Sequence, residues 1–209
     1  MTQQLPRAFR DVQLTGTKVR LRPVHMADAP AGYELFRDDR VVRNLVYEAP
    51  QSLAEEEGFC KLASQLPWVQ EGGRASYNLT IEDIRTPGIV GVVALHRQLN
   101  PLQFEVGYWV GVPHWGRGYA TDAVRLAVHF GFTYLNAARV FAPVFRGNDA
   151  SRRVVEKNNF HLDATRRSQF LKRGQWLDDW FFTLLRSEWE AHSEWYRPQS
   201  EHVAPMSSG

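Results

Sequence analysis

Two glycines at a strand-to-helix junction are the residues whose type and spacing first suggest chemistry in this chain. Gly116 and Gly118 flank Arg117 in the stretch HWGRGYATDA, which directly follows the apolar run FEVGYWVGV. Glycine lets a ligand approach bare backbone N–H groups, and the first N–H groups of a helix have no intrahelical partner. Together with the helix dipole and the Arg117 guanidinium, the junction predicts a cradle for a phosphate or diphosphate. A tight turn without a ligand is the alternative interpretation of the glycine pair alone.

Two better-known phosphate-binding patterns fit this junction less well. In a dinucleotide-binding fingerprint the third glycine position would fall on Thr121, and no acidic residue follows at the expected spacing. A Walker loop would need a Gly-Lys-Ser/Thr sequence, which the chain lacks. The cradle is therefore expected to belong to another fold.

The elements around the cradle predict that fold. Apolar, β-branched or aromatic runs predict strands at residues 17–24, 75–81, 88–95, 103–112, 139–145, 164–172 and 178–186. Helical spacing or capping residues predict helices after Asp28, from Ser52, over 119–135 and from Asn148. A strand-helix-strand crossover from 103–112 to 139–145 makes those two strands parallel neighbours. We therefore expect an α+β domain with a mixed, mostly antiparallel sheet that is flanked by helices.

Length and composition limit the other possibilities. A chain of 209 residues with 44% hydrophobic and 23% charged residues favours one folded domain, for which we expect an extension at 1–14, a domain at 15–190 and a flexible tail at 191–209. The balance of 25 Lys plus Arg against 23 Asp plus Glu gives no reason to expect a nucleic-acid partner. No signal-like or membrane-spanning run is present, so a cytoplasmic location is expected. Cys60 is expected to be a small buried hydrophobe, and no metal is expected.

Several motifs in order resemble one known family. GYWVGVPHWGRGYATDAVRLAVHFGF, then NDASRRVVEKNNF, then GQWLDDWFFTLLRSEW resemble the GNAT superfamily of acyl-CoA-dependent N-acetyltransferases, and RLRPV resembles the opening strand of its Rim-like branch. That branch includes ribosomal-protein N-terminal acetyltransferases. The resemblance covers about residues 17 to 190 and implies a splayed parallel strand pair that holds coenzyme A.

The resemblance implies which residues bind acetyl-CoA. It assigns the pantetheine arm to the backbone of Trp109, Val110, Gly111 and Val112, and the diphosphate to the N–H groups of Gly116, Arg117, Gly118, Tyr119, Ala120 and Thr121. Asn148 resembles the asparagine that contacts the pantetheine region, although a helix cap is an equal interpretation. Arg152 and Arg153 are candidates for the CoA phosphates, or else exposed helix charges.

The catalytic groups are less completely specified. Many members carry a tyrosine that acts as the general acid where this chain has Val155, so protonation of the leaving thiolate by a tyrosine is not expected here. Ser151 is the candidate to hydrogen-bond the sulfur, and Glu105 the candidate base acting through water. An ordinary helix serine and a surface carboxylate are the alternatives. Asp178 matches an aspartate of the branch with a structural or amine-binding role.

The acceptor is the least defined part of the reaction. Trp68, Tyr77, Trp176 and Trp180 are candidates to line its cleft, or else core or sheet-surface aromatics. A protein N-terminus or a small amine would fit the family, and a homodimer is possible. A CoA-binding regulatory module with little catalysis is the alternative function. It is suggested by Val155 and by Asn159, which stands where the family has a glycine.

Overall fold

The computed structural model describes residues 9–65, 68–69 and 75–205. The strands are β1 Phe9–Thr15, β2 Val19–Pro23, β3 Trp68–Val69, β4 Ala75–Asp83, β5 Ile89–Arg97, β6 Gln103–Val110, β7 Arg139–Phe145, β8 His161–Lys172, β9 Gln175–Leu185 and β10 Ser200–Pro205. The α-helices are α1 Ala29–Phe36, α2 Asp39–Val42, α3 Leu53–Ala63, α4 Tyr119–Thr133, α5 Asp149–Lys157, α6 Arg186–Ala191 and α7 Ser193–Tyr196. Short 3-10 turns lie at Met26–Asp28 and Val112–His114.

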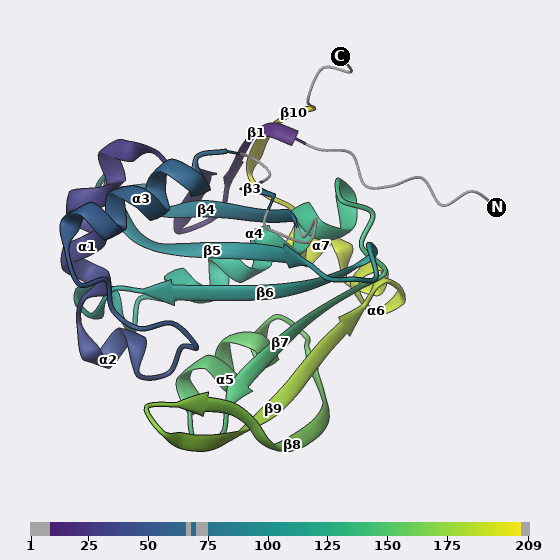
Figure 1. Ribbon diagram of the computed structural model, residues 1–209. Coiled ribbons are helices and arrows are strands. Elements are labelled where there is room, and N and C mark those ends of the chain that lie inside the picture. The colour runs from purple at the N-terminus through teal and green to yellow at the C-terminus, as the bar shows by residue number, and fades with distance from the viewer. Residues whose placement is uncertain (1–8, 66–67, 70–74, 206–209) are drawn as a thin grey trace.

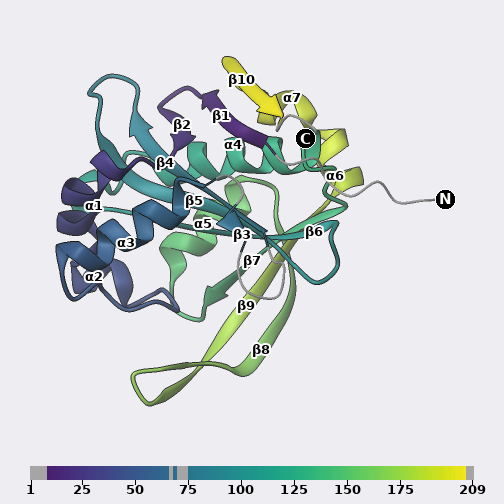
Figure 2. The same ribbon diagram turned by 45° about the horizontal axis from the view of Figure 1, so that its top comes forward.

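The strands form one sheet, in the order β10-β1-β2-β4-β5-β6-β7-β9-β8, with β3 paired to β4. The neighbouring strands run antiparallel except β6 and β7, which are parallel as the crossover predicts. Helices α1 to α3 lie on one side of the sheet and α4 and α5 on the other (Figures 1 and 2). The expected α+β architecture is confirmed.

The main core lies between the sheet and α4. This helix has small and apolar residues at helical spacing, and its Ala123, Val124, Ala127 and Val128 are essentially inaccessible to solvent. Phe130 packs edge-on against the ring of Tyr77 from β4, with centroids 5.3 Å apart. The sheet face toward α4 is therefore apolar, and polar strand residues must lie on the face toward α1 and α3.

That opposite face is polar where the helices α1 and α3 cover it. Thr80 of β4 donates to the Asp28 carboxylate at 2.9 Å, and Arg22 of β2 pairs with the same carboxylate at 2.7 Å. Asp28 is buried, so these donors and the N–H of His25 replace its lost water. The start of α1 is thereby fixed to the sheet.

The parallel pair separates soon after it forms. β6 and β7 are paired only over Gln103–Glu105 and Arg139–Phe141. Beyond those residues β6 continues beside β5 to Val110, whereas β7 continues beside β9 to Phe145. The two strands form a wedge, which is the splayed pair that the family resemblance predicts.

The expectation of a flexible tail at 191–209 is wrong for most of that segment. Ser193–Tyr196 is the helix α7, and Ser200–Pro205 is the strand β10, which pairs antiparallel with β1. Tyr196 is fully buried and donates to the carbonyl of Asn158 at 2.6 Å. The expected boundaries at 14/15 and 190/191 also divide paired strands from their partners, because β1 and β10 belong to the same sheet as the rest.

Candidate active site

The loop after β6 presents a series of backbone N–H groups, those of residues 116 to 121. Gly116 and Gly118 have φ of 75° and 80°, a left-handed conformation that glycine adopts without steric cost. Gly118 is the N-cap of α4. Within the described part of the chain, no backbone carbonyl accepts from the N–H groups of residues 116 to 121. These donors are available to an anion, so the predicted cradle has the geometry it needs.

Side chains hold this loop in place. The indole Nε1 of Trp115 donates to the carbonyl of Val110 at 2.6 Å, which ties the loop to the end of β6. That oxygen was expected to serve a pantetheine amide, so Trp115 already uses part of its acceptor capacity. The buried Tyr119 donates its hydroxyl to the Asp83 carboxylate on β4, which fixes the first turn of α4.

Lys18 is a cradle residue that the sequence analysis missed. Its ammonium donates to the carbonyl of Arg117 at 2.8 Å, and a Cβ added to Gly118 would stand 2.8 Å from the same nitrogen. A second cation therefore lies beside the open N–H groups. Lys18 and Arg117 are 99 positions apart, so no local pattern could have paired them.

A buried ion pair anchors Lys18. The N–H groups of Lys18 and Val19 donate to one oxygen of Asp122, at 2.8 and 3.1 Å. The other oxygen accepts from Arg125 Nε and NH2, at 2.9 and 2.7 Å. Asp122 and Arg125 are each 5% exposed, so four donors converge on a carboxylate that has little water. Arg125 also donates to the carbonyl of Arg197 at 2.8 Å, which joins the cradle to the C-terminal segment.

Glu105 lies at the apex of the wedge. It is the last β6 residue paired with β7, and it lies on the sheet face that is turned toward α1 and α3. Its negative charge adds to the burial that raises the pKa of Tyr47, in the segment between α2 and α3. Its neighbours Phe104 and Val106 pack in the core, so Glu105 faces the side opposite α4, and its role as the base stays a prediction.

His96 lies directly across from Glu105 on β5. Its Nδ1 is 2.8 Å from the Ser76 hydroxyl oxygen, and its Nε2 is 3.7 Å from the position that a Cβ of Gly107 would occupy. Burial lowers the pKa of His96 to about 4, so the imidazole is neutral at neutral pH. The same face therefore carries a carboxylate and a neutral imidazole as neighbours.

The first turn of α5 follows β7, the strand that forms the other side of the wedge. Asn148 is the N-cap and accepts from the N–H of Ser151 at 3.2 Å, so its capping role is confirmed. The Ser151 hydroxyl is 2.7 Å from the hydroxyl of Tyr108 on β6. Tyr108 is a second residue that sequence analysis missed, since only the fold brings the two together.

Comparison with known proteins agrees with this geometry. Residues 18–161, which are more than half of the chain, match the family model described as an acetyltransferase (GNAT) domain. The chain belongs to the GNAT acetyltransferase family. It is an acetyl-CoA-dependent N-acetyltransferase, and its relatives include proteins that are named N-acetyltransferases.

The relatives and solved structures span several acceptors. The uncharacterised N-acetyltransferase YoaA of Bacillus subtilis is 26% identical over 79% of this chain and 92% of its own length. YdaF of the same organism, named provisionally as a ribosomal N-acetyltransferase, is 32% identical over 49% of this chain and 56% of its own. The Vibrio cholerae spermidine N-acetyltransferase, solved with CoA and spermine, has a TM-score of 0.69 at 18% identity and covers 82% of this chain and 98% of its own. This structural likeness shows a common GNAT fold.

Two other candidate residues of this GNAT domain, Arg152 and Asp178, already have partners. Arg152 Nε donates to Glu156 at 2.7 Å, and its guanidinium lies 5.1 Å from the ring centre of Trp180. Asp178 accepts from the N–H of Ser168 at 3.0 Å, in the irregular part of the β8–β9 pair. The contact of Arg152 with CoA phosphates stays a prediction. The bond from Ser168 to Asp178 fits the structural alternative, and recognition of the amine by Asp178 stays a prediction too.

The candidate acceptor aromatics whose side chains the structure describes do not gather at one place. Tyr77 takes the core alternative, because strand alternation turns its ring into the core against α4. Trp176 is 63% exposed near the tip of the β8–β9 hairpin. Trp109 packs instead on Phe36 of α1, with ring centroids 4.8 Å apart. Trp68 is in β3, and its side chain lies outside the described residues.

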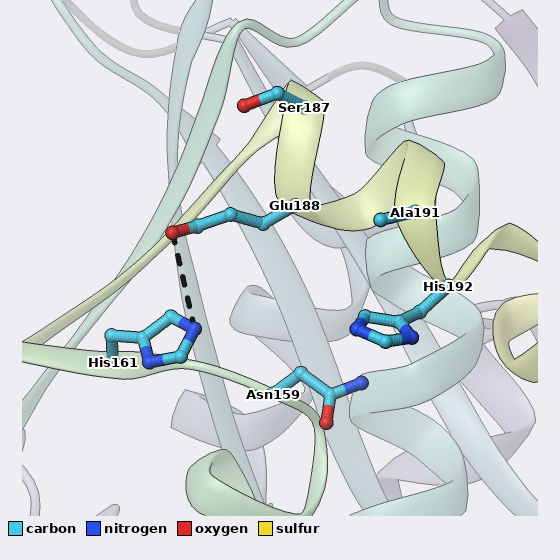
Figure 3. A pocket seen from close by; sticks show the side chains of 6 residues that line it. All are labelled: Asn159, His161, Ser187, Glu188, Ala191 and His192. Carbon is cyan, nitrogen blue, oxygen red and sulfur yellow. Dashed lines mark ion pairs between the residues drawn. The ribbon is translucent and has the colours of Figure 1, made fainter.

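A hollow of about 340 Å³ lies elsewhere, at the end of the sheet opposite the cradle (Figures 1 and 3). It is lined by Asn159, His161, Ser187, Glu188, Ala191 and His192. The Glu188 carboxylate already accepts from the N–H of Leu185 at 2.7 Å and lies 3.9 Å from His161. In the described part of the chain, no three His, Cys, Asp or Glu side chains are placed to hold a metal ion, and no helix there is long and apolar enough to cross a membrane.

Two substitutions in the family pattern have simple structural accounts. Val155 is fully buried in the core and offers no hydroxyl. Asn159 has a φ of 58°, so it takes the left-handed turn that glycine provides in the family, as its tolerance for that conformation predicts. Cys60 is buried, and burial raises the pKa of its thiol to about 12, in keeping with a hydrophobic role.

Proposed function

We propose that this GNAT domain transfers an acetyl group from acetyl-CoA to a primary amine by direct attack in a ternary complex. The observation that carries the proposal is the wedge, which ends in a cradle of N–H groups to which no backbone carbonyl of residues 9–65, 68–69 or 75–205 is bonded. The N–H groups of residues 116 to 121 bind the diphosphate, and Arg117 and Lys18 contribute positive charge. The open edge of β6 toward residues 109–112 pairs with the amides of the pantetheine arm.

In the proposed complex the reacting thioester lies between Glu105 and Ser151. Glu105, at the apex, accepts the amine proton through a water while the nitrogen bonds to the acetyl carbon. Ser151, at the start of α5, donates a hydrogen bond to the sulfur as the carbon–sulfur bond breaks. Holding the two reactants in one site supplies most of the rate enhancement, because the thioester is already reactive toward a neutral amine.

We propose that the acceptor enters on the face that carries Glu105, between α1 and the β8–β9 hairpin. Two classes fit, a protein N-terminus and a small amine, since both present one unhindered primary nitrogen. The segment between α2 and α3 borders this entrance, because Lys172 on the hairpin donates to the carbonyl of Tyr47 at 2.6 Å and pairs with Glu48 at 2.7 Å.

The test is acetyl-CoA binding by calorimetry, followed by thiol release with a panel of peptide N-termini and small amines. Glu105→Gln and Ser151→Ala should retain binding and lose turnover, each by about 10²-fold, which is at the low end for one acid–base or donor group. Glu190→Gln is the matched control, because its carboxylate is 58% exposed and pairs with Arg186 of the same helix at 3.7 Å. Tight binding with no turnover for any acceptor would favour the regulatory module, and no binding would refute the proposed site.

A further inference from the structure

Tyr108 crosses the wedge from one arm to the other. It lies on β6 beyond the last residue paired with β7, and its side chain packs on the core side of the sheet. Its hydroxyl reaches the first turn of α5, where it is 2.7 Å from Ser151 Oγ and 3.2 Å from the Ser151 carbonyl oxygen. The hydroxyl therefore joins a strand on one side of the wedge to the helix that follows the strand on the other side.

Ser151 is unusually constrained for a helix serine. Its N–H is taken by Asn148 Oδ1, and its hydroxyl contacts Tyr108, whereas serines inside helices often bond back to their own helix. One turn later on the same helix, Val155 carries no polar group. The rotation of the Ser151 hydroxyl proton is thus set by whether Tyr108 donates to it or accepts from it.

We infer that Tyr108 is a positioning residue, which donates its hydroxyl proton to Ser151 Oγ and so leaves the Ser151 proton directed at the departing sulfur. This inference rests on the proposed function. Donation from Tyr108 polarises Ser151 and strengthens its own hydrogen bond to a thiolate. Burial raises the pKa of Tyr108, so the phenol keeps its proton throughout, and the thiolate is finally protonated by solvent.

The opposite arrangement makes a different prediction. If Ser151 donated to Tyr108, and Tyr108 donated to the Ser151 carbonyl, the serine proton would be consumed within the pair. Loss of the phenol would then release that proton for the sulfur. Removing the Tyr108 hydroxyl would weaken thiolate stabilisation in the first arrangement and improve it in the second.

The experiment measures the pKa of the CoA thiol bound to the protein, from the ultraviolet absorbance of its thiolate across a pH series. This readout needs no acceptor. In Tyr108→Phe the bound thiol pKa should rise by about half a unit to one unit, a three- to tenfold change, because one hydrogen bond in the chain is lost. Ser151→Ala should raise it at least as much, and the double variant should match Ser151→Ala alone.

Tyr196→Phe is the matched control, since it removes a buried phenol hydroxyl that donates to a backbone carbonyl outside the wedge. It should lower the melting temperature and leave the thiol pKa unchanged. If Tyr108→Phe does not fold, fluorotyrosine incorporated at position 108 replaces it, because a more acidic phenol donates more strongly and should lower the thiol pKa below that of the wild type.

The outcomes separate the two proposals. An unchanged or lowered thiol pKa in Tyr108→Phe, or an unchanged or raised one with fluorotyrosine, overturns the positioning role. A double variant whose shift equals the sum of the two single shifts also overturns it, because independent effects add. Failure of the wild-type protein to bind CoA in calorimetry would instead refute the proposed function.

Discussion

Replacing Asp122 by asparagine tests whether the buried ion pair holds the cradle together. Both carboxylate oxygens act as acceptors, one for two backbone N–H groups and the other for two guanidinium nitrogens. Asparagine keeps the shape but replaces one oxygen with an NH2 group. In either rotamer that NH2 faces two donors, so two hydrogen bonds are lost and like groups meet.

The size of the effect follows from the burial of the pair. A buried donor left without a partner costs about 1–3 kcal/mol, and removing one partner of a buried ion pair costs about 3–5 kcal/mol. These costs describe overlapping losses, so we expect the free energy of unfolding to fall by about 3–5 kcal/mol. For a protein of this size the melting temperature should fall by about 10 °C.

Urea unfolding followed by circular dichroism measures this change directly. Asp163→Asn is the control, because its partner Arg139, at 3.0 Å, forms an ion pair with a 45% exposed carboxylate. Such pairs contribute at most about 1 kcal/mol. If Asp122→Asn costs no more than this control, the buried network does not anchor the cradle and the reasoning is refuted.

Three further changes test other parts of the structure. Gly118→Ala and Gly174→Ala should each cost about 1 kcal/mol of stability, because φ is +80° and +78° there, but only Gly118→Ala should weaken acetyl-CoA binding in calorimetry. Gly91→Ala should cost about 3 kcal/mol in urea unfolding, because its Cβ would stand 2.1 Å from the Trp109 carbonyl oxygen. Burial raises the pKa of Glu56 from 4.5 to about 7, so the folded state binds that proton more tightly than the unfolded state does. The free energy of unfolding should therefore fall as the pH rises from 4.5 to 7. Above pH 7, Glu56→Gln should raise the free energy of unfolding by about 3 kcal/mol relative to the wild type.

Each of these has a result that contradicts it. Equal acetyl-CoA affinity in the Gly118 and Gly174 variants would remove the cradle from the binding site. A Gly91 variant as stable as the wild type would mean that β5 and β6 are not in close backbone contact. A wild-type stability that does not change between pH 4.5 and 7 would show that Glu56 is not held in a medium that disfavours its charge.

The parts of the fold that sequence patterns predicted are those set by neighbouring residues. The strands from Ala75 to Val110 follow runs of β-branched and aromatic residues, and the turn at Gly116 and Gly118 follows from the freedom of glycine. Asn148 caps α5 through a contact three residues away. Such local preferences are visible without the fold.

The parts that the patterns missed depend on distant contacts. β10 has few apolar residues, so its order comes from pairing with β1 rather than from its own composition. Tyr108 meets Ser151 across 43 positions, and nothing near either residue indicates the other. Tyr77 shows a different limit, since alternation predicts that it shares a face with Leu79 but not that this face is the one covered by α4.

The pairing of β10 with β1 has a consequence for how this protein is made. Among the described residues, β1 is paired with β2 only at Leu14 and Thr15, so the rest of the strand has β10 as its paired neighbour. A ribosome must therefore release residues 200–205 before the first strand is fully paired. Until then the edge of the segment from residue 9 to residue 13 lacks the strand that covers it in the folded protein.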